Sequence, residues 1–267
     1  GNLLHIPHDE RGPLRDWSLA ILGALEPKIS DTQAQRGDKA VAEFLEYLKL
    51  LVADRRANPG NPESDVLTRL IQGERSDNGQ RLSENELLHN CIFILNAGHE
   101  TTTNLIGNAL VALEEWPVQK ELLIKRIAES VHDKSSLDDV LNTAVDEFLR
   151  FESSNQLGNR RATVDCVVGG FPLAKGTLIT LCIGSANRDP AQFEHAEEMD
   201  ITRPNCKHLS FAFGIHQCAG LHLARLEGRV ALQIFLQRFP NYKLTAAPTR
   251  GGRARFRGFL NAPFSII

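Results

Sequence analysis

The sequence has no uninterrupted apolar run that approaches the ~20 residues needed to span a bilayer. Residues 1–16 lack the basic-then-apolar order of a secretory signal peptide. Five cysteines among 267 residues are sparse and odd in number, which argues against a disulfide framework and favours a reducing compartment. We therefore expect neither a membrane protein nor a secreted one, and a cytoplasmic location is predicted.

Charge of one sign is not in excess either. Lys and Arg number 30 and Asp and Glu number 33, so the formal net charge is −3. This balance gives no electrostatic reason to expect nucleic acid or an anionic membrane surface as a partner. The only methionine is Met199, so residue 1 is not a translation start, and we expect the chain to be processed or part of a longer protein.

Helical periodicity dominates the first 150 residues. Ser64 and Asp65 are candidate N-caps, and Ser83 with Glu86 matches the spacing of a capping box. Residues 91–97, in the middle of the longest predicted helix, are apolar nearly all round, which predicts burial. Helices are predicted at residues 13–25, 38–54, 83–115, 137–151 and 220–238, with further ones starting at about 66 and 117.

Signals for β-structure appear only after residue 155. They predict strands at 162–168 and 178–182, with turns at Gly169–Gly170 and Lys175–Gly176, and short strands at 242–245 and 264–267. The predicted fold is therefore mostly α with small β-sheets, in a single domain that spans residues 1–267.

The segment from His208 to Glu227, HLSFAFGIHQCAGLHLARLE, has the densest set of chemically active side chains. Cys218 follows a loop that contains Gly214 and directly precedes a helix that begins near Gly220. A thiolate there is stabilised by the N–H groups and the positive dipole end of the helix, and Gly220 leaves room for a flat ligand. Such a thiolate is a candidate axial ligand of haem iron, because its electron donation favours O–O cleavage.

Two other interpretations of this segment stay open. A structural role is a common fate of a free cysteine. Alternatively, a zinc site would draw on nearby Cys and His side chains, although the one-residue gaps inside Cys206-x-His208 and His216-x-Cys218 are shorter than the two to about four residues that structural zinc sites favour. That zinc set would comprise Cys206, His208, His216, Cys218 and His222.

The complete string resembles the haem-binding loop of the cytochrome P-450 family, F-x-x-G-x-H/R-x-C-x-G. The matching residues are Phe211, Gly214, His216, Cys218 and Gly220. The resemblance implies a bound haem b with Cys218 as the iron ligand and the other four residues around it. Ala212 departs from the pattern, because it stands where Gly is common. Gln217 is also unusual, and beside the thiolate it would add a hydrogen bond that raises the reduction potential.

A second match lies in the long predicted helix, at Ala97-Gly98-His99-Glu100-Thr101-Thr102. One interpretation is local: the threonines bond back to the preceding turn, and Glu100 lies on an exposed face. The family has A/G-G-x-D/E-T at this point, and the resemblance implies a local helix distortion over the haem, with Ala97 at the cofactor. Glu100 and Thr101 would then be the catalytic acid–alcohol pair that hydrogen-bonds dioxygen and relays protons to it.

Glu147-x-x-Arg150 taken alone is an i,i+3 pair of the kind that contributes about a few tenths of a kcal/mol at a surface. It gains weight because Asn187-Arg188-Asp189-Pro190 and Asp200-x-x-Arg203 follow in the family's order. The resemblance implies that Glu147, Arg150 and Arg203 form a structural, non-catalytic triad that locks the loop ahead of the cysteine.

The haem propionates are expected to be held by Arg160 and His216. The family's R-x-A-x-x-D strand maps onto Arg160, and a planar guanidinium suits a carboxylate bidentately. Arg161 is the alternative to Arg160, and His208 is a weaker propionate candidate. Either histidine could equally be a satisfied loop residue.

The motifs together predict the C-terminal portion of a soluble, bacterial-type cytochrome P-450 whose N-terminal part is absent. The resemblance implies a monooxygenase that inserts one atom of dioxygen into a small organic substrate. Electrons are expected from a separate ferredoxin or flavoprotein, since no G-x-G-x-x-G loop or cluster-type cysteine set appears. Two alternatives stay open: a peroxide-using haem-thiolate enzyme, and a truncated haem-binding remnant without monooxygenase activity.

Overall fold

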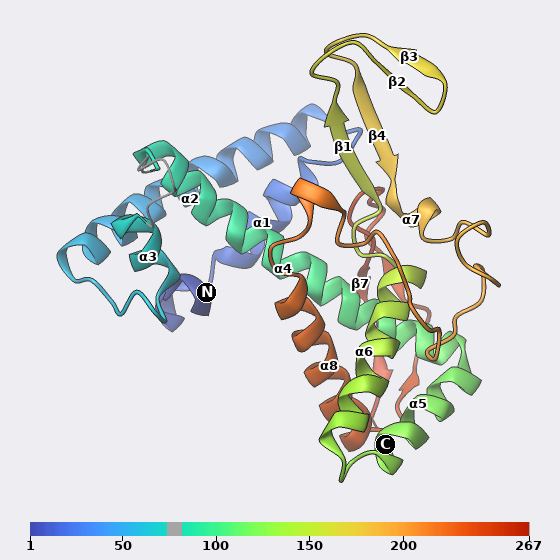
Figure 1. Cartoon of the computed structure of the whole chain (residues 1–267). Helices are drawn as coiled ribbons and strands as arrows, with labels where there is room; N and C mark the ends of the chain where they lie inside the picture. The colour runs from blue at the N-terminus through green and yellow to red at the C-terminus, as the bar shows by residue number, and fades with distance from the viewer. Residues whose placement is uncertain (74–81, 267) are drawn as a thin grey trace. The chain divides into compact units, whose positions relative to one another are not determined.

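The computed structural model describes residues 1–73 and 82–266 (Figure 1). The contacts within it divide the chain into two compact units, residues 1–100 and 101–267, and each unit has its own buried apolar core. The longest helix, α4 (Glu84–Glu115), contributes to both units. The single-domain organisation expected from the sequence stays a prediction.

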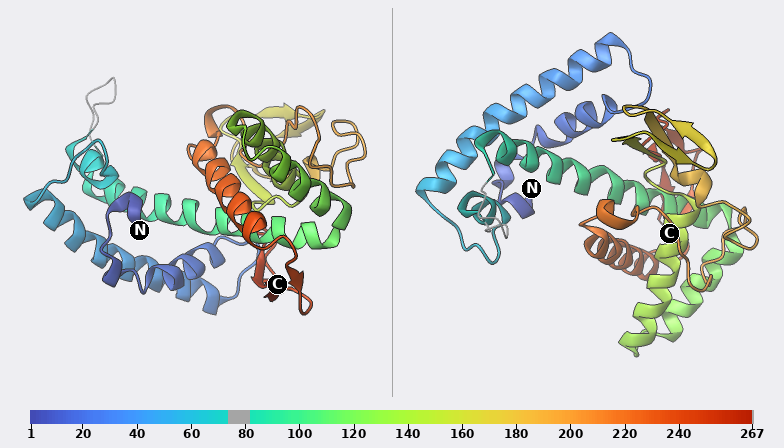
Figure 2. Two further views of the ribbon diagram at one scale, coloured as in Figure 1. Left: turned by 90° about the horizontal axis from the view of Figure 1, so that it is seen from below. Right: turned by 45° about the horizontal axis from the view of Figure 1, so that its top comes forward.

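The described part of the first unit is helical. It contains the 3₁₀ helices η1 (Asn2–Leu4) and η2 (His8–Glu10), the helices α1 (Leu14–Gly23), α2 (Asp31–Ala57) and α3 (Val66–Gln72), and the first half of α4. Helix α1 packs along α2 (Figure 2), and Trp17 stacks on Phe44 with ring centroids 5.0 Å apart. Helix α2 starts seven residues before the predicted 38, because Ser30 and Gln33 form a capping box in which each side chain accepts the other's backbone N–H.

Asp65 caps α3, as predicted. Its carboxylate accepts the N–H of Leu67 at 3.0 Å and the hydroxyl of Thr68 at 2.6 Å, and it forms an ion pair with Arg55 of α2. Burial alone would raise the pKa of this carboxyl. The hydrogen bonds from Thr68 and Arg55 outweigh burial and hold the pKa of Asp65 below its ordinary value.

The start of α4 also confirms its prediction. The N–H of Glu86 donates to the Ser83 hydroxyl at 3.3 Å, and the N–H of Ser83 donates to the Glu86 carboxylate at 2.8 Å. The prediction that residues 91–97 are buried all round is wrong in part. Cys91 is buried, but Phe93 is 68% exposed and Ala97 is exposed. Apolar composition alone does not reveal which face of a helix its neighbours cover.

The second unit is built on helices. Beside the second half of α4 they are α5 (Pro117–Glu129), α6 (Lys134–Phe151), the short α7 (Ile183–Ala186) and α8 (Leu221–Arg238). Pro117 occupies the first turn of α5, where its missing N–H costs nothing. Helices α6 and α8 lie side by side (Figure 2). Gly228 lets α8 approach both α6 and α4, because a Cβ there would lie 3.5 Å from Val145 of α6 and 3.2 Å from Leu105 of α4.

The strands of the second unit form four antiparallel pairs among the described residues: β1 (Leu157–Arg161) with β4 (Leu178–Cys182), β2 (Cys166–Val168) with β3 (Phe171–Leu173), β5 (Lys243–Leu244) with β8 (Phe264–Ser265), and β6 (Thr249–Arg250) with β7 (Phe259–Asn261).

The positions of these strands test the sequence predictions. The predicted turn Gly169–Gly170 is confirmed, and both residues have positive φ. The bounds of the predicted strand 162–168 are wrong, because β1 ends at Arg161 and β2 begins only at Cys166. Ala162 lies between them and forms backbone hydrogen bonds with Gly176 and Thr177. Strand β8 begins at the predicted residue 264, and residue 267 lies outside the described part. The mostly helical fold with small β-sheets is confirmed.

A buried carboxylate fixes the C-terminal strands to the helical core. Glu152, directly after α6, is 9% exposed and lies within ion-pair distance of three guanidiniums. These belong to Arg188 at 3.8 Å, Arg250 at 3.1 Å and Arg257 at 2.9 Å. One negative charge thus holds together the end of α6, the segment after α7 and the β6–β7 pair.

Within the described residues, every helix is too short or too polar to cross a membrane.

Candidate functional site

Cys218 lies in the short turn between the 3₁₀ helix η3 (Gly214–His216) and α8. Its N–H donates to the carbonyl of Phe211 at 2.9 Å, and its own carbonyl accepts the N–H of Leu221 at 3.4 Å. The thiol is exposed and precedes the N-terminus of an 18-residue helix, whose N-cap is Gly220. This placement before the positive dipole end of α8 is the one the sequence predicts.

The surface beside this thiol is apolar and open. Phe213 is 82% exposed and Ile215 is 98% exposed, which is unusual for large apolar side chains grouped on one short loop. A Cβ on Gly220 would meet only the Cys218 sulfur, at 3.9 Å. An exposed thiol ligand flanked by exposed apolar side chains and a bare glycine fits a flat, largely apolar macrocycle that carries a metal ion.

The loop backbone is strained at one position. Gly214 has φ +66° and Ala212 has φ +55°, so both lie in the left-handed region. Glycine tolerates this conformation, whereas an L-residue such as Ala212 pays about 1–2 kcal/mol for it. The geometry explains physically why Gly is common at the position of Ala212 in the family.

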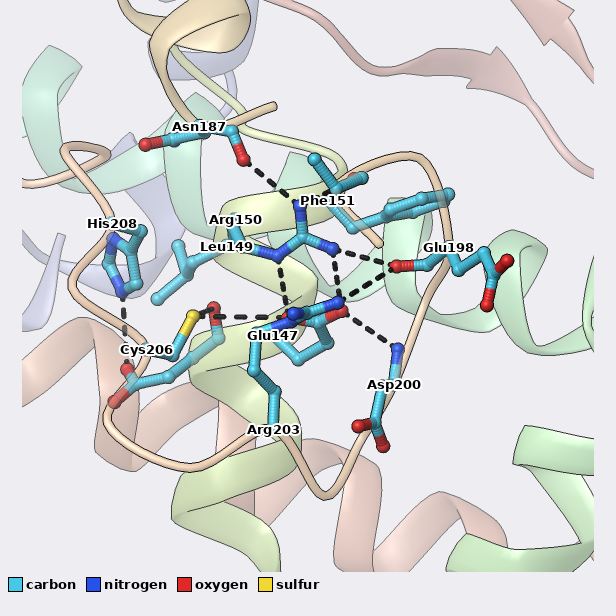
Figure 3. Close-up of polar contacts among 12 residues, drawn as sticks. Glu147, Leu149, Arg150, Phe151, Asn187, Glu198, Asp200, Arg203, Cys206 and His208 are labelled. Atoms are coloured by element: carbon cyan, nitrogen blue, oxygen red, sulfur yellow. Dashed lines mark hydrogen bonds and ion pairs between the residues drawn. The ribbon is translucent and has the colours of Figure 1, made fainter. Parts of the chain in front are cut away.

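Arg150 is completely buried near the end of α6, and all five of its N–H groups have partners (Figure 3). Two donate to the carboxylate of Glu147, each at 2.7 Å. The other three donate to backbone carbonyls, those of Asn187 at 3.0 Å and of Ala196 and Glu198 at 2.8 Å. One side chain therefore fixes three points on the segment between α7 and the cysteine loop.

Glu147 is also completely buried, and its carboxylate accepts hydrogen bonds from other residues besides Arg150. Its Oε2 accepts from Arg203 Nε at 3.0 Å, and its Oε1 accepts the N–H of Asp200 at 2.8 Å (Figure 3). Arg203 in turn donates to the carbonyl of Glu194 at 2.6 Å. The structure thus brings Glu147, Arg150 and Arg203 together, as the resemblance implied.

The structure separates the propionate candidates. Arg160, on β1, is half-buried and donates to the carbonyl of its neighbour Asn159, whereas Arg161 donates across the sheet to Gly176. His216 is exposed on the cysteine loop. The weaker candidate His208 is wrong for this role, because its imidazole is only 2% exposed and contacts a carboxylate of α6.

The zinc interpretation finds no support in the described residues, where no three His, Cys, Asp or Glu side chains gather as metal ligands. Cys206 packs against the triad, with its sulfur 3.6 Å from the carbonyl of Asp146. Burial, and then the charge of Glu147, raise the pKa of the Cys206 thiol to about 12. Of these two cysteines, Cys206 is therefore a neutral thiol held against the triad, and Cys218 is the one whose sulfur is exposed to a ligand.

Glu100 and Thr101 lie in α4, where the two compact units meet in sequence. Helix α4 is continuous from Glu84 to Glu115, so the local distortion that the resemblance implied does not interrupt it. Glu100 is only 9% exposed, so the interpretation that placed it on an exposed face is wrong. Thr101 is half-buried.

Sequence reasoning named Asn187 only as part of a family string and missed how it supports the site. The side chain of Asn187 is completely buried, donates to Ser153 at 2.7 Å and to Ser210 at 2.8 Å, and accepts the N–H of Leu209 at 2.7 Å. Asp146, next to Glu147, was not singled out at all. In the sequence these polar residues only interrupt apolar helix faces and loops, and that pattern does not indicate which distant residues they contact.

Solved structures identify the fold. The structure of P450BioI in complex with an acyl carrier protein ligated to hexadec-9Z-enoic acid superposes with a TM-score of 0.89 at 31% sequence identity, and the match covers 100% of this chain and 64% of that one. The structure of the bacillaene polyketide synthase cytochrome P450 PksS from Bacillus subtilis 168 gives a TM-score of 0.85 at 34% identity and covers 99% of this chain and 64% of that one. The fold is the C-terminal portion of the one that these cytochrome P450 structures share.

Sequence comparison gives the family. A model of the cytochrome P450 family matches residues 22–249. The biotin biosynthesis cytochrome P450 of Bacillus subtilis (strain 168) is 33% identical over 91% of this chain and 57% of the relative, and PksS of the same organism is 36% identical over 92% and 56%. The chain belongs to the cytochrome P450 family and spans little more than half the length of these relatives.

Proposed function

We propose that this chain forms the haem-binding part of a haem-thiolate monooxygenase, which inserts one atom of dioxygen into a small organic substrate. The observation that carries the proposal is the exposed Cys218 thiol before α8, on a loop whose two supports, the Phe211 carbonyl and the Glu147–Arg150–Arg203 cluster, are both in place. The cofactor is a haem, and the proposal makes it haem b. Electrons come from a separate ferredoxin or flavoprotein, in the cytoplasm.

Each site residue has a proposed task. Cys218 binds the iron as a thiolate, while Phe211, Gly214 and Gly220 shape the loop around it. Arg160 and His216 hold the propionates, a role for which a half-buried guanidinium and an exposed imidazole are chemically suited.

On α4 the proposed tasks concern oxygen. Ala97 has no side chain beyond its Cβ and leaves space beside the cofactor. The Glu100 carboxyl and the Thr101 hydroxyl bind dioxygen by hydrogen bonds and deliver protons to it. The bound haem supplies the reductive activation of dioxygen.

Reconstitution with haem tests the proposal. The chain is expected to bind one haem and to give, when reduced under carbon monoxide, the red-shifted Soret band of a thiolate-ligated haem. Cys218→Ala should abolish this band. Cys182→Ala is the matched control, because Cys182 is also an exposed cysteine of the second unit and should leave the band unchanged. Failure to bind haem, or a band without the thiolate shift, would support a non-catalytic remnant instead.

The pair on α4 has its own test. Thr101→Val removes the hydroxyl at nearly constant volume and is expected to leave the carbon monoxide spectrum intact. Any oxygen consumption supported by an added reductase should then be diverted to peroxide. The peroxide-using alternative would be favoured if Thr101→Val with added peroxide turned over substrate as fast as the parent chain does with dioxygen.

A further inference from the structure

A second polar cluster touches the cysteine loop, apart from the Glu147–Arg150–Arg203 triad. Its centre is Asp146, on α6. A single carboxylate oxygen, Oδ1, accepts from Arg225 Nε of α8 at 2.7 Å and lies 3.3 Å from His208 Nε2. The backbone N–H of Ser210 donates to His208 Nδ1 at 3.2 Å, so Nε2 carries the hydrogen and donates to Asp146.

The two partners of Asp146 meet again on one aromatic ring. The guanidinium carbon of Arg225 lies 4.8 Å from the centroid of the Phe211 ring, and the His208 ring lies 5.6 Å from the same ring, centroid to centroid. A guanidinium over an aromatic face is attracted to it, and both partners pack against the ring. The carbonyl of this same Phe211 accepts the N–H of Cys218.

The two clusters hold different parts of the chain. The triad contacts backbone atoms of residues 187–200, through Arg150, Glu147 and Arg203. The Asp146 cluster contacts residues 208–225, which include the cysteine. The resulting connection runs from Asp146 through His208 and Arg225 to Phe211 and then to the Cys218 N–H.

We propose that Asp146 is a positioning residue for Cys218: by holding His208 and Arg225 against Phe211, it fixes the carbonyl that orients the backbone of the thiolate ligand. Only the role of Cys218 as an iron ligand rests on the proposed function. The positioning itself is a property of the chain without haem.

The charge state suits this role. Burial alone would raise the pKa of Asp146, but the hydrogen bonds from His208 and Arg225 outweigh it and keep the pKa below its ordinary value. The carboxylate is therefore ionised at neutral pH, and both of its hydrogen bonds are charge-assisted.

The chain offers a matched control. Asp138 of α6 pairs with Arg229 of α8 at 3.1 Å, so this pair joins the same two helices with the same residue types. It makes no contact with the cysteine loop in the described interactions. Asp138→Ala therefore removes one α6–α8 ion pair and leaves the contacts around Phe211 in place.

The experiment uses the haem-free chain and two local readouts. Hydrogen exchange reports the Cys218 N–H, and the rate of alkylation, mapped by mass spectrometry, reports the Cys218 thiol against that of Cys182. We expect Asp146→Ala to speed exchange of the Cys218 N–H by at least about tenfold, the size expected for losing charge-assisted hydrogen bonds. Alkylation of Cys218 should become slower, because a displaced thiol loses the helix N-terminus that stabilises its thiolate. Asp138→Ala should change both by less than about twofold, and the alkylation of Cys182 should be constant.

Two further variants keep the inference open to refutation. If circular dichroism shows that Asp146→Ala does not fold, Arg225→Lys retains the charge but loses the planar contact with Phe211, and it should also speed exchange at Cys218. Asp146→Glu should restore part of the protection. Unchanged exchange at Cys218 in folded Asp146→Ala, or an equal effect of Asp138→Ala, would overturn the inference. Because haem is not used, failure of the proposed monooxygenase function is recognised separately, by the spectrum of the reconstituted chain.

Discussion

Replacing Arg150 is expected to be among the most damaging single substitutions in the second unit. Arg150→Met preserves an unbranched side chain but removes a guanidinium whose five N–H groups are all hydrogen-bonded in a completely buried position. Glu147 would keep Arg203 and the N–H of Asp200 but would lose its bidentate partner.

The magnitude follows from the burial. Removing one partner of a buried ion pair typically costs about 3–5 kcal/mol, because the other charge stays buried without compensation. Three backbone carbonyls lose their donors as well, and unmade buried hydrogen bonds cost about 1–3 kcal/mol each where water does not replace them. Since a domain of this kind has about 5–15 kcal/mol of total stability, we expect Arg150→Met to lower the free energy of unfolding by at least about 3 kcal/mol.

The chain provides a local probe for this measurement. Trp116 packs edge-on against Phe151, the residue next to Arg150, with ring centroids 5.7 Å apart. The other of the two tryptophans, Trp17, belongs to the first unit. In a Trp17→Phe background, urea unfolding followed by fluorescence therefore reports the second unit alone.

Two comparisons make the result decisive. Lys125→Ala removes an exposed ion pair with Glu129 in the same unit and should cost no more than about 0.5 kcal/mol. The double variant Glu147→Gln/Arg150→Met should be less destabilised than the sum of its single variants by about 2 kcal/mol, because the second change removes a buried charge that the first leaves with Arg203 as its remaining guanidinium partner. A cost for Arg150→Met no larger than that of Lys125→Ala would refute the reasoning.

Three further predictions concern strain, charge and pH. Ala212→Gly relieves the positive φ and should raise the free energy of unfolding by about 0.5–1 kcal/mol in the same urea assay, since the gain of 1–2 is partly offset by glycine entropy; a loss of stability would contradict the strain argument. Glu152→Gln leaves three partly exposed guanidiniums without their carboxylate, so we expect the free energy of unfolding to fall by about 1–3 kcal/mol and residues 245–262 to be cleaved faster by proteases. No change in either measurement would show that water already screens the three guanidiniums. The pKa of Asp65 is lower in the folded state, so its contribution to stability is complete above the unfolded-state pKa of about 3.9 and is lost as pH falls through the folded-state pKa. An Asp65→Asn variant should therefore lose less stability between pH 5 and about 3 than the parent chain. Parallel curves of unfolding free energy against pH would contradict this assignment.

The features that the sequence predicts well are local ones. Three of them depend on residues no more than three positions apart, and the structure has all three. They are the capping box of Ser83 and Glu86, the cap at Asp65 and the Gly169–Gly170 turn. The cysteine loop is also a local pattern. Its five matching residues fall within ten positions, so they are recognisable without any knowledge of the fold.

The features that were missed depend on distant partners. Glu152 and Arg257 are 105 residues apart, and Asp146 and Arg225 are 79 apart. Nothing in the spacing of such residues indicates that they meet. The β6–β7 pair was missed for a related reason: its strands are two and three residues long, too short for alternation to be visible.

The contacts of Arg150 and Arg203 with backbone carbonyls have a consequence for how this chain can diverge. The carbonyls of Glu194, His195 and Glu198 are bound, while their side chains are largely exposed. A carbonyl is the same group in every residue, so the path of this segment is specified from outside it, by α6 and by Arg203. The exposed side chains at Glu194 and Glu198 are therefore free to change, and with them the character of the surface they present, without moving the loop that carries Cys218.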